Sequence, residues 1–159
     1  MTRTGNGKWN GGYSFDGSDD SINAGSGVSL DITGAITVVA WVKAGTQSAK
    51  GIISKMVSNV NTRSWAVYSA TSDKITVIIT QNGLYPTNAK LYTTSIPVLN
   101  NLRHQVSFTF ISQTLKIYVD GIEDIGVTKT TDNSVTSLYS NPSVNVTIGS
   151  FSLPSDPFS

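Results

Sequence analysis

The feature of this sequence that most constrains its fold is a repeated alternation of apolar and other side chains over short segments. In AITVVAWVK (35–43), Ile36, Val38, Ala40 and Val42 fall on one face. The same period of two recurs in three further segments, KITVIIT (74–80), HQVSFTF (104–110) and TLKIYV (114–119). Successive side chains of a β-strand point to opposite faces, so this spacing predicts strands. No segment carries the apolar stripe of a long amphipathic helix.

Shorter strands are expected between these segments, at 13–15, 21–23, 51–55, 65–69, 90–94, 123–128 and 145–149. Asp120-Gly121, directly after TLKIYV, is a pair that readily adopts the positive φ angles of a two-residue hairpin turn. About ten short strands separated by Gly, Asn and Ser are typical of an antiparallel sandwich or barrel. The sequence therefore predicts an all-β fold, in which Tyr13 and Phe15 are expected to face the core.

The charge and composition of the chain exclude several classes of partner. Charged residues make up 13% of the sequence, the net charge is +1, and the lysines and arginines are scattered singly, so there is no basic stripe for nucleic acid. No apolar run is long enough to cross a bilayer. The absence of cysteine excludes a thiolate metal site. We therefore expect neither nucleic-acid binding nor membrane insertion.

The carboxylates are poorly placed for catalysis. A glycosidase needs two carboxylates that face each other at roughly 5–10 Å, and one strand provides them only at alternate positions. No E-x-D-x-E pattern occurs, and the single glutamate, Glu123, follows a hairpin turn. The single histidine, His104, opens a strand and is interpreted as a hydrogen-bonding residue. The sequence thus argues against an enzyme.

Three aspartates, Asp16, Asp19 and Asp20, crowd into YSFDGSDDSIN (13–23). Asp and Gly between two short strands are what a turn requires, so one interpretation is purely structural. Three carboxylates in one loop also repel each other unless a cation neutralises them, and Ca²⁺ accepts carboxylate and carbonyl oxygens. The spacing does not fit an EF-hand loop. A turn and a calcium site both remain open.

Aromatic side chains are the candidates for sugar contact, because the apolar face of a pyranose ring stacks on Trp or Tyr. Tyr85 lies in the loop TQNGLYPTNAK (80–90), beside two asparagines. Trp41 belongs to a strand that is largely apolar on both faces, and it is expected in the core. The predicted ligand-binding residues are Trp65, Tyr68, Asn82, Tyr85 and Asn88.

Four segments, in this order, resemble the laminin-G-like, concanavalin-A-like jelly-roll domains. YSFDGSDDSINAGSGVSLDITGAITVVAWVKA (13–44) resembles their opening, in which a strand ending F-D-G precedes a D-D turn and an A-W-V-K strand. The other three segments are GIISK (51–55), RHQVSFTFISQTLKIYVDGIE (103–123) and VTIGSFS (146–152). Arg103 stands where the family usually has tryptophan, and Ile111-Ser112 replaces its customary Asp-Gly turn.

The resemblance implies an antiparallel two-sheet jelly roll over residues 13–152, with an N-terminal extension at 1–12 and a C-terminal tail at 153–159. Many family members hold a calcium ion at the rim of the sandwich, which makes Asp16 with Asp19 or Asp20 the implied ligands. Members usually end in one more strand, which pairs near the N-terminal strand and is missing from this sequence. We therefore expect a fragment with an open sheet edge, through which other protein chains could pair.

By the same resemblance, we expect a non-catalytic carbohydrate-binding or adhesion module of a larger extracellular or virion protein. Its partner would be a glycan or polysaccharide. A structural phage-tail or decoration domain that makes protein–protein contacts is the alternative, and a glycan hydrolase or lyase of the same fold is disfavoured. MTRTGNGKWNGGY (1–13) lacks the apolar stretch of a signal peptide, so export would need a signal elsewhere or release within a particle.

Overall fold

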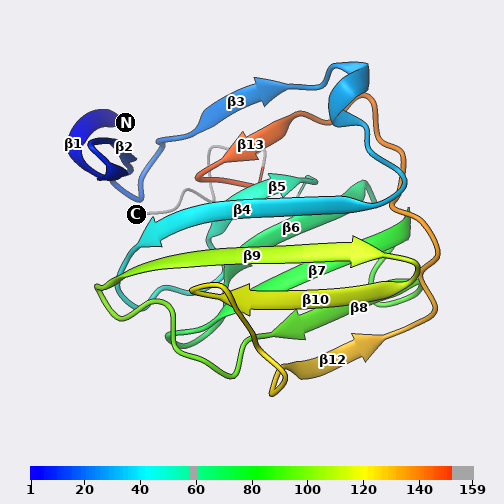
Figure 1. Cartoon of the computed structure of the whole chain (residues 1–159). Helices are drawn as coiled ribbons and strands as arrows, with labels where there is room; N and C mark the ends of the chain where they lie inside the picture. The colour runs from blue at the N-terminus through cyan, green and yellow to red at the C-terminus, as the bar shows by residue number, and fades with distance from the viewer. Residues whose placement is uncertain (58–60, 152–159) are drawn as a thin grey trace.

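The computed structural model describes residues 1–57 and 61–151, and this part of the chain folds as two packed β-sheets and a separate hairpin (Figure 1). The predicted 153–159 tail lies outside the described residues. One short 3-10 turn, η1, spans Val28–Leu30. The strands are β1 (Thr2–Trp9), β2 (Gly11–Ser14), β3 (Ile22–Gly25), β4 (Ile36–Lys43), β5 (Gly51–Lys55), β6 (Arg63–Ser69), β7 (Ile75–Gly83), β8 (Ala89–Thr93), β9 (Arg103–Ile111), β10 (Thr114–Val119), β11 (Ile122–Glu123), β12 (Thr128–Asp132) and β13 (Val146–Ile148).

The two sheets differ in width. The larger has seven strands in the order β12-β8-β7-β6-β5-β13-β3, and the smaller has four in the order β11-β10-β9-β4. Every ladder is antiparallel, in the hairpin as well as in the two sheets. The prediction of an all-β antiparallel two-sheet sandwich is confirmed. No helix in the described residues is long and apolar enough to cross a membrane.

The core lies between the sheets and is built from the alternating residues of each strand. On β9 and β10 the buried positions are every second residue, including Phe108 and Ile117. Trp65 of β6 enters the same core from the opposite sheet, with its ring centroid 6.1 Å from that of Phe108. Burial of large apolar side chains from both inner faces is what holds two such sheets together.

The late hairpin forms as its sequence predicts. Asp120 and Gly121 are its two turn residues, with φ angles of 52° and 82°. His104 Nδ1 donates to Asp120 Oδ2 at 2.7 Å, which confirms the interpretation of this histidine as a hydrogen-bonding residue. The preceding turn, between β9 and β10, uses Ser112 and Gln113 at φ angles of 48° and 69°, without a glycine.

The strand predicted at 123–128 is wrong, because Asp124 interrupts it. This carboxylate is buried and accepts hydrogen bonds from Ser95 N, Ser95 Oγ and Ile96 N, which tie it to the connection between β8 and β9. Burial alone would raise its pKa, but these hydrogen bonds hold the pKa of Asp124 below its ordinary value. The chain therefore leaves the small sheet after β11 and enters the large sheet as β12.

The first fourteen residues form a hairpin rather than an unstructured extension. β1 and β2 pair only with each other, and the predicted domain boundary between residues 12 and 13 falls inside β2. The hairpin lies at one end of the sandwich, beside the end of β4 (Figure 1). Within the described chain, β4 pairs with β9 alone, so its other edge is unpaired. This arrangement leaves one side of the sandwich open.

Candidate functional site

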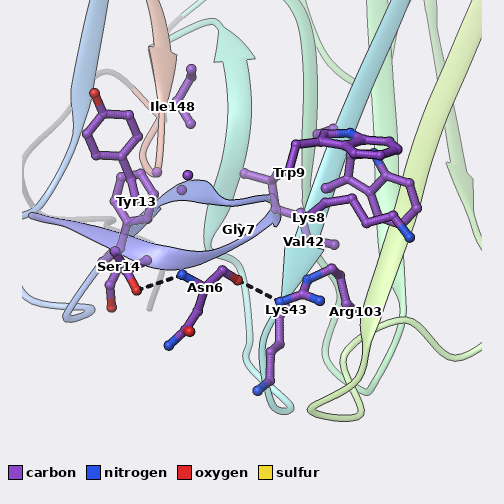
Figure 2. A pocket seen from close by; sticks show the side chains of 18 of the residues that line it. Asn6, Gly7, Lys8, Trp9, Tyr13, Ser14, Val42, Lys43, Arg103 and Ile148 are labelled. Carbon is purple, nitrogen blue, oxygen red and sulfur yellow. Dashed lines mark hydrogen bonds between the residues drawn. The ribbon is translucent and has the colours of Figure 1, made fainter.

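A groove of about 500 Å³ lies between the β1–β2 hairpin and β4 (Figure 2). Residues 39–43 of β4 form one wall, and the hairpin forms the other. Ile52 and Ile53 of β5 and Ile148 of β13 line it from the opposite sheet. Its volume falls within the range of roughly 300–1,000 Å³ that is typical of ligand pockets.

Two tryptophans and a tyrosine give this groove exposed aromatic surface. Trp9 is 79% exposed, Tyr13 54% and Trp41 38%. The ammonium of Lys8 lies 4.5 Å from the centroid of the Trp41 ring and 5.7 Å from that of Trp9, so a cation–π contact links the hairpin to β4. Large exposed aromatic side chains that gather at a groove are typical of ligand-contact surfaces.

The expectation that Trp41 and Tyr13 belong to the core is wrong. β4 is apolar on both faces, but the small sheet is covered on one face only, and Trp41 shares the uncovered face with Val39 and Lys43. Tyr13 belongs to β2, whose only partner is β1, so it lies outside the sandwich. Phe15 is half-buried, and its ring lies against Gly149.

The hairpin is attached to the sandwich by the Lys8–Trp41 contact and by a hydrogen bond from β9. The guanidinium of Arg103, on β9, donates a hydrogen bond to the Asn6 carbonyl at 2.6 Å (Figure 2). Within the hairpin, Gly7 packs so closely against Gly11 that a Cβ on Gly7 would overlap the Gly11 carbonyl. Glycine at residue 7 is therefore a steric requirement of this hairpin. Arg103, where the resembled family usually has tryptophan, provides the polar attachment.

The groove carries positive charge. Lys8, Lys43 and Arg103 line it, and no aspartate or glutamate is among its described lining residues. The nearby carboxylate of Asp120 is engaged by His104, and its pKa is lowered chiefly by that hydrogen bond, with a smaller contribution from the charge of Lys8. Such a groove can stack a ring and donate hydrogen bonds, but its lining provides no carboxylate for acid–base chemistry.

Of the residues predicted to contact ligand, Trp65 is buried and the prediction for it is wrong. Its side chain is 4% exposed and packs in the core, so it cannot stack on a sugar. Tyr68 lies on the other face of β6, half-buried, with its ring 5.4 Å from that of Phe151 in an edge-on contact. Burial, with a smaller effect of Tyr85, raises the pKa of Tyr68 to about 12.

The other three predicted residues lie at the end of β7 and in the loop after it. Tyr85 is 41% exposed, and its effect on the pKa of Tyr68 places these two tyrosines near each other. Asn82 Oδ1 accepts from Leu84 N at 3.1 Å, and Asn88 has a φ of 54°, so both asparagines shape the loop. None of the three is among the residues that line the β4 groove.

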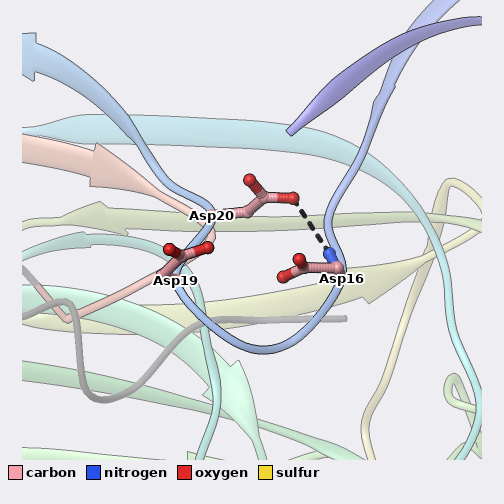
Figure 3. Close-up of side chains that lie close together, drawn as sticks. All are labelled: Asp16, Asp19 and Asp20. Carbon is pink, nitrogen blue, oxygen red and sulfur yellow. Dashed lines mark hydrogen bonds between the residues drawn. The ribbon is translucent and has the colours of Figure 1, made fainter.

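The three predicted metal ligands do come together (Figure 3). Asp16, Asp19 and Asp20 each offer a carboxylate oxygen, and these oxygens lie within 4.8 Å of one another. Asp20 Oδ2 accepts from Asp16 N at 3.0 Å, and Asp16 Oδ1 accepts from Ser18 N at 2.8 Å. The terminal ammonium of Met1 also contacts Asp20. The cluster therefore makes the hydrogen bonds of a turn and retains further oxygens that suit a hard cation.

Residues 16–158 match the profile of a protein family described as the concanavalin A-like lectin/glucanases superfamily. The chain belongs to this superfamily. The match begins after the hairpin, so the hairpin wall of the groove lies outside the matched region. A comparison of this chain with curated proteins finds no match.

Two solved structures of similar fold have low sequence identity to this member of the superfamily. One is a native heptameric SAP-like pentraxin from Limulus polyphemus, with 15% identity and a TM-score of 0.48, covering 76% of this chain and 55% of the pentraxin chain. The other is domain 4 of AbnA, a GH43 extracellular arabinanase from Geobacillus stearothermophilus, in complex with arabinotriose. It shares 14% identity at a TM-score of 0.49, and the match covers 99% of this chain and 76% of that one.

Sequence reasoning missed the hairpin, and with it Lys8; Trp9 was among the aromatic candidates for sugar contact but was not chosen as a ligand-binding residue. The available signal was Asn10-Gly11, a pair that favours a tight turn, directly after Trp9. In the structure Asn10 has a φ of 69° and the chain reverses there, with Trp9 opposite Gly11. Trp41 had a signal too, because Lys43 two residues later shares its face of the strand.

Gly7→Ala is predicted to displace the hairpin from β4 while the sandwich stays folded, because the added methyl group would overlap the backbone of Gly11. NMR contacts between Lys8 and the Trp41 ring should disappear, with the core signals of β9 unchanged. Gly5→Ala is the matched control, since its Cβ would lie 3.8 Å from the nearest atom, the Asn10 carbonyl oxygen, an ordinary contact. Lys8–Trp41 contacts that survive in the Gly7 variant would contradict this description of the hairpin.

Proposed function

We propose that this chain is a non-catalytic carbohydrate-binding module and that the groove beside β4 is its binding site. The observation that carries the proposal is the pair of exposed indole rings, Trp9 and Trp41, that flank Lys8 at the groove. An exposed ring offers the apolar face on which a sugar stacks, and the neighbouring ammonium and guanidinium groups are donors for its hydroxyl oxygens.

The lining of the groove supports binding rather than hydrolysis. Glycoside hydrolysis uses two carboxyl groups on either side of the scissile bond. The described residues that line the groove include three cationic side chains and no carboxylate. Membership of a superfamily whose description covers both lectins and glucanases is compatible with either role, so the lining residues favour the lectin-like one.

The protein in which such a module would act is part of the same proposal. We place it outside the cell or on a virion, where a glycan-binding domain would attach a larger protein to a polysaccharide surface. The low share of charged residues and the abundance of Ser, Thr, Asn and Gly fit such a surface role. Detection of the chain in culture supernatant or in purified particles, rather than in the cytoplasm, would support this location.

Trp9→Ala and Trp41→Ala are each predicted to weaken glycan binding by about fivefold, because a lost aromatic contact is worth about 1 kcal/mol. The measurement is affinity electrophoresis over a panel of polysaccharides, followed by calorimetry on the best ligand. Tyr85→Ala is the matched control, since Tyr85 is about as exposed as Trp41 but lies in the loop between β7 and β8, outside the described groove lining. The sandwich should remain folded in all three variants.

The same variants distinguish the groove beside β4 from a second candidate surface, the one around Tyr68 and Tyr85. Loss of binding in Tyr85→Ala alone would move the site to the Tyr68–Tyr85 surface and overturn the assignment to the groove. Failure of the parent protein to bind any polysaccharide would overturn the carbohydrate proposal itself.

A role in protein–protein contacts, as an adhesion or virion structural domain, is the second candidate function. The observation that favours it is the unpaired edge of β4, because open edges readily pair with strands of other chains. A protein that binds a partner chain but no polysaccharide would favour this candidate over the first.

We further propose that Asp16, Asp19 and Asp20 hold a calcium ion. Their oxygens lie close enough to share one ion, and loop carbonyls and water would complete its coordination. The ion would neutralise three neighbouring carboxylates and fix the turn between β2 and β3. None of the three aspartates is among the described residues that line the groove, so the role proposed for the ion is structural.

Addition of Ca²⁺ is predicted to raise the melting temperature by about 2–4 °C for each kcal/mol of binding free energy, and EDTA should reverse the shift. Asp19→Asn should abolish the response, because it removes one ligand charge while leaving the hydrogen bonds made by Asp16 and Asp20 in place. Asp73→Asn, a carboxylate outside the cluster, serves as control. Equal melting temperatures in Ca²⁺ and EDTA would contradict the calcium proposal.

A further inference from the structure

The outer face of the small sheet carries uncharged polar side chains at its centre. Strand β9 lies between β4 and β10. Its inward residues are buried in the core, so the outward residues between Arg103 and Ile111 are Gln105, Ser107 and Thr109. All three are half-buried and uncharged. Figure 1 looks onto this face, and no other strand of the described chain lies in front of β9.

These polar groups are not used within the fold. The backbone N–H of Gln105 donates to Asp120, but the Gln105 side chain forms no hydrogen bond with any described residue. Within the same part of the chain, the hydroxyl groups of Ser107, Thr109 and Tyr118 also form none. An amide offers two donors and an acceptor, and a hydroxyl offers one donor and two acceptor lone pairs. The face thus keeps a set of hydrogen-bonding groups that a ligand can use.

Two aromatic side chains flank this polar centre, one on each side of β9. Trp41 of β4 lies opposite Gln105, and Tyr118 of β10 lies opposite Ser107. Trp41 is 38% exposed and Tyr118 is half-buried, and Val39, opposite Ser107 on β4, is 55% exposed. The two strands that carry the rings are about 10 Å apart, because β9 lies between them. A ligand that contacts both rings must therefore contain several linked sugars.

We propose that the ligand is a neutral linear polysaccharide whose chain passes from Trp41 across β9 to Tyr118. This inference rests on the proposed carbohydrate-binding function, and it extends the site at Trp41 onto the outer face of the small sheet. One sugar stacks on the Trp41 indole and a later one on the Tyr118 ring. The sugars between them exchange hydrogen bonds with Gln105 and Ser107.

The charges around this face select a neutral polysaccharide. At one end, the Lys8 ammonium already contacts the Trp41 ring at 4.5 Å from its centroid. Beside Tyr118 on β10, Lys116 is paired with Glu123 at 2.9 Å. The outward residues of β9 between the two rings carry no charge. A chain with a charge on every sugar would set those charges over β9 without a complementary partner, whereas a neutral chain needs none.

The test begins with affinity electrophoresis of the full chain in gels that contain a polysaccharide. Xylan, mannan and mixed-linkage β-glucan are the neutral probes, and polygalacturonate is the anionic one. At least one neutral polysaccharide should retard the chain more strongly than polygalacturonate does. Calorimetry with oligosaccharides of that polysaccharide should then show affinity rising with length, because only a longer chain reaches Tyr118.

Tyr118→Ala should weaken binding of the longest oligosaccharide by about fivefold and remove the gain in affinity with length. Tyr118→Phe should keep most of the binding, because the ring remains. Ser107→Arg should weaken binding as well, since the larger side chain would lie in the path of the ligand. Thr130→Arg, the same change of charge at an exposed residue of β12, is the matched control and should bind as the parent does. Unchanged core signals of β9 in NMR spectra would show that each variant is folded.

The outcomes separate this inference from the function on which it rests. Binding of a neutral polysaccharide that is unchanged in both Tyr118→Ala and Ser107→Arg would overturn the inference and leave the proposed function intact. Tighter binding of polygalacturonate than of every neutral probe would overturn the ligand class proposed for this face. Failure to bind any polysaccharide would overturn the proposed function, and the inference with it.

Discussion

Among the described residues, strand β4 forms its ladder with β9 alone, and the shape of one whole side of the sandwich follows from this pairing. On its inner face, Ile36 and Val42 are buried in the core between the sheets. On its outer face, Trp41 contacts the Lys8 ammonium of the hairpin. Along its unpaired edge, the structure keeps a groove lined by isoleucines from the opposite sheet. The candidate site is therefore built around one strand, whose inner face belongs to the core, whose outer face contacts the hairpin and whose unpaired edge borders the groove.

The charged side chains that line this groove determine which ligands it can bind. Most carboxylates of the described chain are engaged elsewhere, as in the buried Asp124 and in Asp120 with its histidine. The groove is left with three cationic side chains beside two indole rings. A ligand with hydroxyl oxygens and an apolar face fits the rings and the donors beside them. Such a ligand would use the hairpin as a wall, which makes Gly7 and Arg103 important for binding.

The alternation of side chains was enough to predict the sheets and the core, because burial between two sheets depends on period two alone. It did not predict that one face of the small sheet is left uncovered, and this is why Trp41 was wrongly expected in the core. The error with Trp65 was avoidable, since an odd and an even position on one strand, Trp65 and Tyr68, cannot share a face. The acidic turn was predictable as a cluster because its three residues are adjacent in sequence. The groove was not, because its described lining comes from six strands brought together by the fold.

The measurement that tests this account most directly is native-state hydrogen exchange of the β4 amides, followed by NMR on the free protein. An unpaired edge predicts that every second amide between Ile36 and Lys43 exchanges much faster than its neighbours, while the central amides of β9 are protected throughout. Uniform protection along β4 would mean that the edge is already paired, and it would contradict both the groove and its hairpin wall.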